Sequence, residues 1–287
     1  MNSFFRKVRI ILEMIKFSHT VFALPFAIMS AFLAAGGMPD SSQLFWILMC
    51  MVGARSAAMS FNRIADARYD ALNPRTAQRP IPAGKLTIAE TASFLVVMAG
   101  LFVFSAYQLN RLAFALSPVA LAVILGYSYT KRFTSSSHFL LGLSLAIAPV
   151  GAWIAISESI SLIPLLLGLA VLLWTAGFDI IYACQDVEFD ERVGLYSLPR
   201  RIGLAPALFV SALLHAAMVG ILLVVSAIAH LGVAFFAGIL LVAALLVYEH
   251  LIVRPNDLSR VNTAFFNVNG TVSVILMSLT ILDIYLS

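Results

Sequence analysis

Charged side chains are scarce in this sequence. Aspartate, glutamate, lysine and arginine make up 11% of its 287 residues, whereas hydrophobic residues make up 61%. Soluble domains carry about 25% charged residues, so the composition excludes an ordinary soluble protein and indicates a polytopic membrane protein. The net charge of +4 requires no nucleic acid partner, because the positions of the basic residues along the chain explain it better.

Cysteine and histidine are also rare. Cys50 and Cys184 lie in or at the edge of apolar segments, which favours small buried side chains over a disulfide framework. The five histidines lack the spacing of metal ligands. His19 is predicted at the cytoplasmic edge of a span, and a substrate role stays open for it. The histidines interpreted as structural or interfacial are His138, His215, His230 and His250.

Long apolar runs are abundant, and each approaches the ~20 residues that a membrane-spanning helix needs. They predict an all-α protein with nine transmembrane helices. The amino terminus is basic and precedes an apolar run, as in a signal peptide, but eight more runs follow, so the first is interpreted as a retained span. The predicted spans are roughly 17–37, 42–61, 86–107, 111–130, 137–157, 160–184, 204–228, 231–251 and 262–285.

Basic residues are nearly absent from every second connection between these spans. Of the 18 lysines and arginines, only Arg111 falls in the connections after spans one, three, five and seven. The positive-inside rule therefore predicts that the amino terminus and the basic loops lie in the cytoplasm. With nine spans, the carboxyl terminus is then outside.

One polar stretch, residues 60–76, contrasts with this apolar background. Asn62, Asp66 and Asp70 are four residues apart, which places them on one face of a helix. Mg²⁺ prefers oxygen ligands and keeps water or substrate phosphate in its remaining positions. Two carboxylates and a carboxamide beside several arginines therefore suit a divalent cation that binds phosphate. The neighbouring arginines are Arg63, Arg68, Arg75 and Arg79.

A second polar stretch repeats this layout about 120 residues later. Asp186 and Asp190 are four apart, and Asp179 lies seven residues earlier, about two helical turns deeper in a predicted span. Arg55 precedes Asn62 by the same distance in the first stretch. The shared layout indicates an internal repeat within a single domain. The two halves and the domain cover about residues 17–130, 137–251 and 1–287.

Arg55 and Asp179 are predicted inside spans, where a charge costs at least about 2.5–3.5 kcal/mol. They either pair and hold two helices together or, as we favour, line a polar pocket that binds substrate. The carboxylate pairs either form a solvated cytoplasmic face or bind metal. Four converging acids would repel one another, and Mg²⁺ ions holding a diphosphate between them would remove this repulsion. Two pairs at the ends of apolar spans favour the metal site.

These motifs resemble the two aspartate-rich motifs of the UbiA family of intramembrane prenyltransferases. The first is Asn62-x-x-x-Asp66-x-x-x-Asp70, followed by Asn73-Pro74-Arg75-Thr76 and Arg79-Pro80. The second is Asp186-x-x-x-Asp190, followed by Gly194 and Ser197. Tyr127-x-x-x-Lys131-Arg132 is similar to a family stretch after the fourth helix, and residues 16–26 and 265–269 are similar to bacterial members. The resemblance runs from about residue 10 to the end.

The resemblance implies nine helices around a central cavity that both motifs cap on the cytoplasmic side of a bacterial inner membrane. It implies Mg²⁺-dependent transfer of a polyprenyl group from its diphosphate to an acceptor, as by 4-hydroxybenzoate polyprenyltransferases in quinone biosynthesis. The expected Mg²⁺ ligands are Asn62, Asp66, Asp70, Asp186 and Asp190. The expected catalytic residues are these four aspartates together with Asp179. The expected diphosphate contacts are Arg63, Lys131 and Arg132, and the expected shields of an allylic carbocation are Tyr127, Tyr129 and Tyr182, with Trp174 as a further candidate.

The acceptor is less closely defined than the reaction. Arg55 suits the carboxylate of an aromatic acid, and Asp179 suits its phenol or the ring proton that is lost. 4-Hydroxybenzoate, the acid of ubiquinone synthesis, is the first expectation. The second motif, from Tyr182 to Asp190, is closer to family members of the futalosine menaquinone route. The alternative acceptor is therefore 1,4-dihydroxy-6-naphthoate, and prenyl length and oligomeric state stay open.

Two other classes share part of these features. Ion-coupled transporters also carry intramembrane acids and internal repeats, but acids at one membrane face beside arginines favour chemistry on a diphosphate. CDP-alcohol phosphotransferases are Mg²⁺ membrane enzymes whose motif opens with Asp-Gly. Asp66-Ala-Arg68 imitates part of that motif, yet no Asp-Gly pair precedes it.

Overall fold

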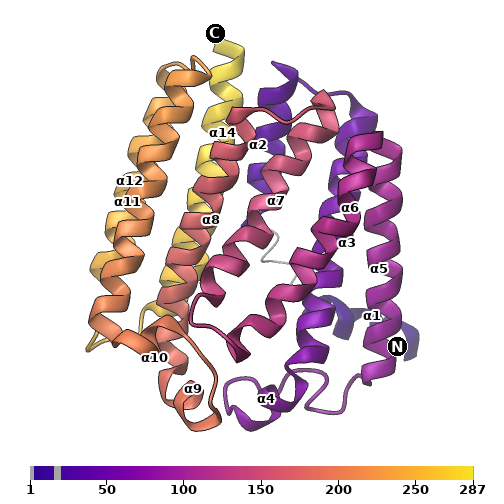
Figure 1. The fold of residues 1–287 in the computed structure, drawn as a ribbon, viewed down its shortest axis with the longest axis vertical. Helices are drawn as coiled ribbons and strands as arrows, with labels where there is room; N and C mark the ends of the chain where they lie inside the picture. Colours follow the sequence, from indigo (N-terminus) through magenta and orange to yellow (C-terminus); the bar gives the residue numbers. More distant parts are fainter. Residues whose placement is uncertain (1–2, 16–20, 287) are drawn as a thin grey trace.

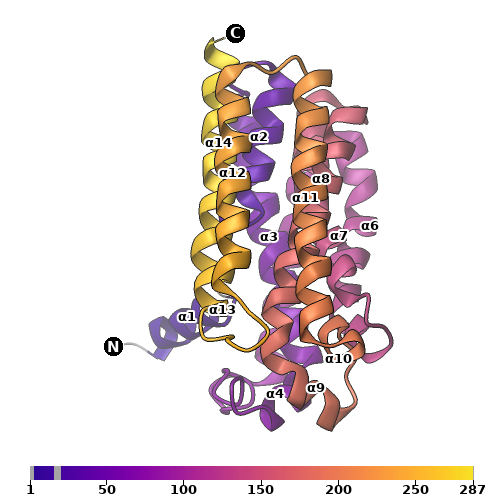
Figure 2. The same cartoon turned by 90° about the vertical axis from the view of Figure 1, so that its left-hand side faces the viewer.

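The computed structural model describes residues 3–15 and 21–286, and in this part of the chain all regular elements are helices. The prediction of an all-α protein is thus confirmed. The long helices run side by side along the longest axis of the molecule, with the C-terminus at one end and helix α1 (Ser3–Met14) across the other (Figures 1 and 2).

Within residues 3–15 and 21–286, eight stretches are long and apolar enough to cross a bilayer, and each overlaps a predicted span. The remaining predicted span, 17–37, contains the shorter apolar helix α2 (Leu24–Ala35), while His19 lies outside the described residues. The chain is therefore an integral, multi-pass membrane protein. The long helices are α3 (Ser41–Ala65), α5 (Ile88–Leu109), α6 (Arg111–Gly126), α7 (Ser137–Ser157), α8 (Leu162–Ala183), α11 (Leu204–Ile228), α12 (Val233–Ile252) and α14 (Asn269–Leu286).

Short helices continue several of the long ones, and those that follow α3 and α8 gather at the end of the bundle opposite the C-terminus (Figure 1). The short α-helices are α4 (Ala67–Leu72), α9 (Val187–Val193), α10 (Leu198–Ile202) and α13 (Val261–Thr263). The other short elements are the 3₁₀ helices η2 (Tyr127–Arg132) and η3 (Cys184–Asp186) and the π-helix η4 (Ala264–Val268).

Helix α8 is the most buried long helix and packs against both α7 and α11, while α12 packs against α14. Trp174 and Phe178 of α8 form the centre of the largest apolar core, together with Phe26 from the first turn of α2 and Phe22 just before that helix. On the outer surface, large apolar side chains are exposed along the long helices, as a surface in contact with lipid requires. Helix α8 is therefore held in position by the helices packed around it, and it can form one wall of a cavity.

Two glycines allow the helices beside the site to approach closely. A Cβ atom at Gly142 in α7 would collide with the carbonyl oxygen of Leu172 in α8. A Cβ atom at Gly53 in α3 would lie 2.8 Å from the backbone nitrogen of Phe102 in α5. Small residues at such crossings let van der Waals packing drive helix association in lipid.

We expect the Gly142→Ala variant to have a lower melting temperature in detergent, because its new methyl group would force α7 away from α8 at a cost of about 1–3 kcal/mol. The matched control is Gly151→Ala on the same helix, where an added Cβ atom meets no atom within 4 Å. That control should be neutral or stabilised by up to about 1 kcal/mol, since alanine favours helix more than glycine does. Equal melting temperatures for the two variants would contradict this account of the crossing.

Candidate active site

A cavity of about 1280 Å³ opens between α2, α3, α6, α7 and α8. Its walls are apolar along most of their length, with side chains such as Ala27, Ile47 and Leu141, and become polar where the short helices α4 and α9 begin. Ligand pockets commonly enclose ~300–1,000 Å³. This cavity therefore has room for more than one small substrate.

The first aspartate motif lies where α3 gives way to α4. Asp66 sits at the break itself, with φ −92° and ψ 1°, and Asp70 lies one turn later on α4. The predicted helical face is thus interrupted at Asp66, yet Asn62, Asp66 and Asp70 all line the cavity. The side-chain amide of Asn62 donates to Asp66 at 2.9 Å, and Arg79 donates to both oxygens of Asp70 at 2.7 and 2.8 Å.

The second motif repeats this local structure where α8 gives way to α9. Asp186 sits at the break, with φ −106° and ψ 5°, and Asp190 lies one turn later on α9. Asp190 is 2% exposed, and its Oδ2 atom has no hydrogen-bond partner within the described residues. A buried carboxylate oxygen without a donor costs free energy, so a cation bound at this position would stabilise it.

Arg75 joins the two motifs across the cavity. Its guanidinium donates to Asp186 at 3.1 Å from Nε and 2.5 Å from Nη2, and to the Tyr182 hydroxyl at 2.7 Å. The side chain of Asn73, two residues before it, also donates to Asp186 at 3.4 Å. The loop after α4 therefore binds directly to the second motif. The sequence placed Arg75 only at the rim of the first motif.

Basic side chains from α3 and η2 complete this polar end. Arg63 is buried and donates to Asn62 Oδ1 at 3.1 Å. Arg132 donates to the carbonyl of Ala65 at 2.6 Å and lies 3.7 Å from an oxygen of Asp66. Lys131 also lines the cavity. All three predicted diphosphate contacts are thus brought beside the two aspartate motifs.

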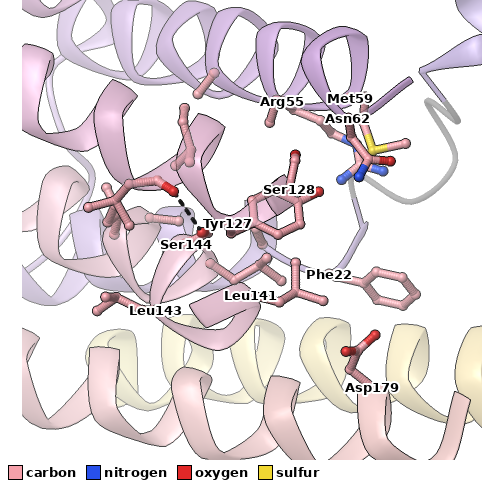
Figure 3. Close-up of a pocket in the computed structure, with 18 of the residues that line it drawn as sticks. Phe22, Arg55, Met59, Asn62, Tyr127, Ser128, Leu141, Leu143, Ser144 and Asp179 are labelled. Atoms are coloured by element: carbon pink, nitrogen blue, oxygen red, sulfur yellow. Dashed lines mark hydrogen bonds between the residues drawn. The ribbon is translucent and has the colours of Figure 1, made fainter. Parts of the chain in front are cut away.

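Arg55 and Asp179 lie on opposite walls of the same cavity (Figure 3). Asp179 points from α8 into the cavity, while Arg55 and Asn62 come from the helix on the far side, with Tyr127 between the two walls. The hydrogen-bond partner of Asp179 is His138, whose Nδ1 lies 2.7 Å from Asp179 Oδ2. The sequence treated His138 as structural, because nothing local links it to an aspartate 41 residues away.

The aromatic candidates divide into two groups. Tyr127 and Tyr182 line the cavity, and Tyr182 packs against Phe265 with ring centroids 4.3 Å apart. Tyr129 is 39% exposed and packs on Phe61 and Arg132 outside the lining. Trp174 is fully buried in the core, where its indole donates to Asn269. The structure therefore brings two of the four expected aromatic rings to the cavity.

The donor set at the polar end fits a hard divalent cation. All five expected ligands offer oxygen atoms, the kind that Mg²⁺ prefers. Burial, and then the neighbouring charge of Asp70, raise the pKa of Asp66 above the usual value of an aspartate, and a bound cation would counteract both effects. Within the described residues no three acids, histidines or cysteines form a ready cluster. Mg²⁺ commonly uses only one or two carboxylates with substrate phosphates, so separate carboxylates suit it.

Comparison with known proteins gives consistent matches over most of the chain. The model of the UbiA prenyltransferase family matches residues 23–271. The 4-hydroxybenzoate octaprenyltransferase of Aeromonas salmonicida is 32% identical over 252 residues, which are 87% of this chain and 86% of that protein. The enzyme of the same name from Tolumonas auensis is 30% identical over 237 residues, or 83% and 82% of the two chains.

Solved structures show the same architecture. The apo structure of a UbiA homolog from Aeropyrum pernix K1 superposes with a TM-score of 0.84 and 34% identity, covering 92% of this chain and 98% of that one. A UbiA homolog from Archaeoglobus fulgidus bound to DMAPP and Mg²⁺ has a TM-score of 0.72 and 19% identity, covering 96% and 99%. At 19% identity the second similarity concerns the fold alone.

Proposed function

Since this chain belongs to the UbiA prenyltransferase family and is a membrane prenyltransferase, we propose that it transfers a polyprenyl group from polyprenyl diphosphate to a small aromatic acid. The proposed acceptor is of the 4-hydroxybenzoate type, and the proposed cofactor is Mg²⁺. The names of the bacterial relatives support this acceptor, and the Mg²⁺ and DMAPP in the Archaeoglobus fulgidus homologue support the metal and the donor class.

The observation that carries the proposal is the pairing of two different polar sites in one apolar cavity. At one end, two aspartate motifs and several basic side chains from distant parts of the chain converge. Beyond this end, Arg55 and Asp179 lie on facing walls. A charged diphosphate and a small aromatic acid need such separate sites, and a prenyl chain needs the apolar walls between and beyond them.

In this proposal, Asp66, Asp70, Asp186 and Asp190 hold the metal ions, with Asn62 as a neutral oxygen ligand. Bound Mg²⁺ would supply positive charge that stabilises the departing diphosphate. Arg63, Lys131 and Arg132 would bind phosphate oxygens directly and add to that stabilisation. Because these cations are buried or half-buried beside the carboxylates, their attraction for the developing negative charge is stronger than it would be in water.

The other side chains would control what happens to the allylic carbocation after the carbon–oxygen bond breaks. Tyr127 and Tyr182 present aromatic rings to the cavity, and ring faces attract cations. The apolar walls exclude water that would otherwise capture the carbocation. Arg55 would bind the carboxylate of the acceptor with two hydrogen bonds. Asp179, on the opposite wall, would accept a proton from the phenol or from the substituted ring carbon.

We further propose that the end bearing α4 and α9 faces the cytoplasm of a bacterial cell, with the C-terminus outside, as the basic loops predict. The positions of α1 and the C-terminus at opposite ends support this orientation (Figure 1). The internal repeat, with halves at about residues 17–130 and 137–251, is supported by the two helix breaks. Asp66 and Asp186 adopt similar backbone angles at corresponding positions of the two motifs.

An assay with membranes that contain the protein tests the proposal. The reaction contains MgCl₂, labelled geranyl diphosphate, and either 4-hydroxybenzoate or 1,4-dihydroxy-6-naphthoate. We expect prenylated 4-hydroxybenzoate, its loss in EDTA and its recovery with excess Mg²⁺. Product from the naphthoate alone would instead assign the alternative acceptor. No turnover of the diphosphate by folded protein would contradict the proposed reaction and favour the ion-coupled transporter.

A further inference from the structure

His138, at the start of α7, contacts two other parts of the chain. Its Nδ1 atom lies 2.7 Å from Asp179 Oδ2 on α8, and its Nε2 atom lies 3.2 Å from the backbone nitrogen of Leu198 at the start of α10. A backbone N–H donates, so Nε2 must accept and carries no proton. The proton of the neutral ring is then on Nδ1, and His138 donates it to Asp179.

This arrangement fixes both the ring and the carboxylate. The His138 side chain is fully buried, whereas that of Asp179 is 17% exposed and faces the cavity. Within the described residues, hydrogen bonds of the Asp179 carboxylate are made by Oδ2 and leave Oδ1 for a substrate. A second proton on His138 would break its contact with Leu198. The two contacts together therefore describe a neutral ring that donates to an Asp179 carboxylate, the form that a proton acceptor needs.

The contact between His138 and Leu198 connects the part of the cavity proposed for the acceptor to the part proposed for the diphosphate. Leu198 begins the short helix that follows α9, the helix that carries Asp190. His138 thus links Asp179 on one side to the backbone beyond the second aspartate motif on the other.

We propose that His138 is a positioning residue, which holds the Asp179 carboxylate in the orientation that the aromatic acceptor requires. The inference rests on the proposed function, in which Asp179 contacts the acceptor. It predicts an effect on the acceptor acid and not on the prenyl diphosphate. A histidine that only held helices together would change the amount of folded protein and its melting temperature, and would leave the KM for the acid in the folded fraction unchanged.

Two amide variants separate the contacts of His138, because each reproduces the position of one ring nitrogen. In His138→Asn, the amide nitrogen takes the place of Nδ1 and keeps the hydrogen bond to Asp179. In His138→Gln, the longer side chain places its amide oxygen near the position of Nε2, which keeps the contact with Leu198 but removes the donor to Asp179. A third variant, Leu198→Pro, is at the first position of a helix, where proline is tolerated. It replaces the backbone N–H with a ring carbon, so it removes the donor to His138 and pushes the buried imidazole out of its present position.

The measurement is kcat/KM for the aromatic acid and KM for geranyl diphosphate, with whichever acid the wild type prenylates. We expect His138→Gln to lower kcat/KM for the acid by about 10- to 100-fold, because small misplacements of a reacting group have effects of this size. Its KM for geranyl diphosphate should be unchanged, and His138→Asn should recover most of the activity. Leu198→Pro should give a loss of the same kind, because it moves the ring that holds Asp179.

Three outcomes would overturn the inference. They are wild-type kinetics in His138→Gln, equal losses in His138→Gln and His138→Asn, and a change in KM for geranyl diphosphate that is as large as the change for the acid. If His138→Gln does not fold, Leu198→Pro alone decides the question by the same two parameters. A wild-type protein that prenylates neither acid would contradict the proposed function instead, so the two failures are distinguishable.

Discussion

The Asp190→Asn variant is expected to lose prenyl transfer while its fold becomes no less stable. An amide has the shape of the carboxylate but lacks its charge, so it would bind Mg²⁺ poorly. Loss of one group that stabilises the developing charge commonly costs about 100- to 1000-fold in rate. The variant also exchanges a buried charged oxygen, which has no hydrogen-bond partner within the described part of the chain, for a neutral amide nitrogen. A neutral amide costs less to bury than a carboxylate does, so the melting temperature should be preserved.

Glu188→Gln is the matched control for Asp190→Asn. Glu188 lies on the same short helix and loses the same charge, but it is exposed and does not line the cavity. The measurements are kcat/KM for geranyl diphosphate, the Mg²⁺ concentration at half-maximal rate, and the melting temperature. We expect the control to match the wild type in all three. Asp190→Asn with the rate and Mg²⁺ dependence of the control would remove this residue from the proposed metal site.

Replacing Arg55 with leucine is expected to raise the KM for the aromatic acid by about 100-fold, which corresponds to about 2.7 kcal/mol. The guanidinium would bind the acceptor carboxylate through two charge-assisted hydrogen bonds in a cavity that contains little water. The KM for geranyl diphosphate should change little, because the aspartate motifs and Lys131 would bind that substrate. Arg55→Lys keeps the charge but not the planar pair of donors, so it should recover only part of the affinity.

The control for Arg55 uses a second arginine and a second acceptor. Arg68→Gln removes an exposed arginine outside the cavity lining and should leave both KM values unchanged. 4-Hydroxybenzamide lacks the carboxylate charge and should be a poor acceptor for the wild type. In Arg55→Leu it should be no worse than in the wild type, since the two changes remove one interaction. Additive losses would show that Arg55 does not bind the carboxylate.

Features within one helix were predictable from the sequence because they depend on local spacing. The span from 137–157 coincides with the bounds of α7, since a helix in lipid must be apolar along its length. The four-residue spacing of Asp66 and Asp70, and of Asp186 and Asp190, correctly placed both members of each pair beside one cavity. The break at Asp66 was not predicted, because its backbone angles leave no periodic signal in the sequence.

Partners between helices were not predictable in the same way. Arg75 and Asp186 are 111 residues apart, and their contact depends on how two loops meet above the cavity. The sequence left two explanations for buried Asp179, which were a bond to Arg55 and a place in a polar pocket. The structure places Asp179 in the pocket but pairs it with His138. Tyr127 and Tyr129 are two residues apart and looked equivalent, yet only the first lines the cavity.

The sequence by itself determined that this chain crosses a membrane many times, that two aspartate motifs end two of its spans, and that it belongs to a family of prenyltransferases. Composition and periodicity encode the first two properties, because lipid selects apolar helices and a helix repeats every 3.6 residues. The family is shown by the resemblance of the motifs and by the matching family model. Only the tertiary structure decided which side chains share the cavity and which atoms pair, as for Asp179 with His138. Those contacts depend on the rotation and approach of helices distant in sequence, and close packing between helices, not local spacing, determines both.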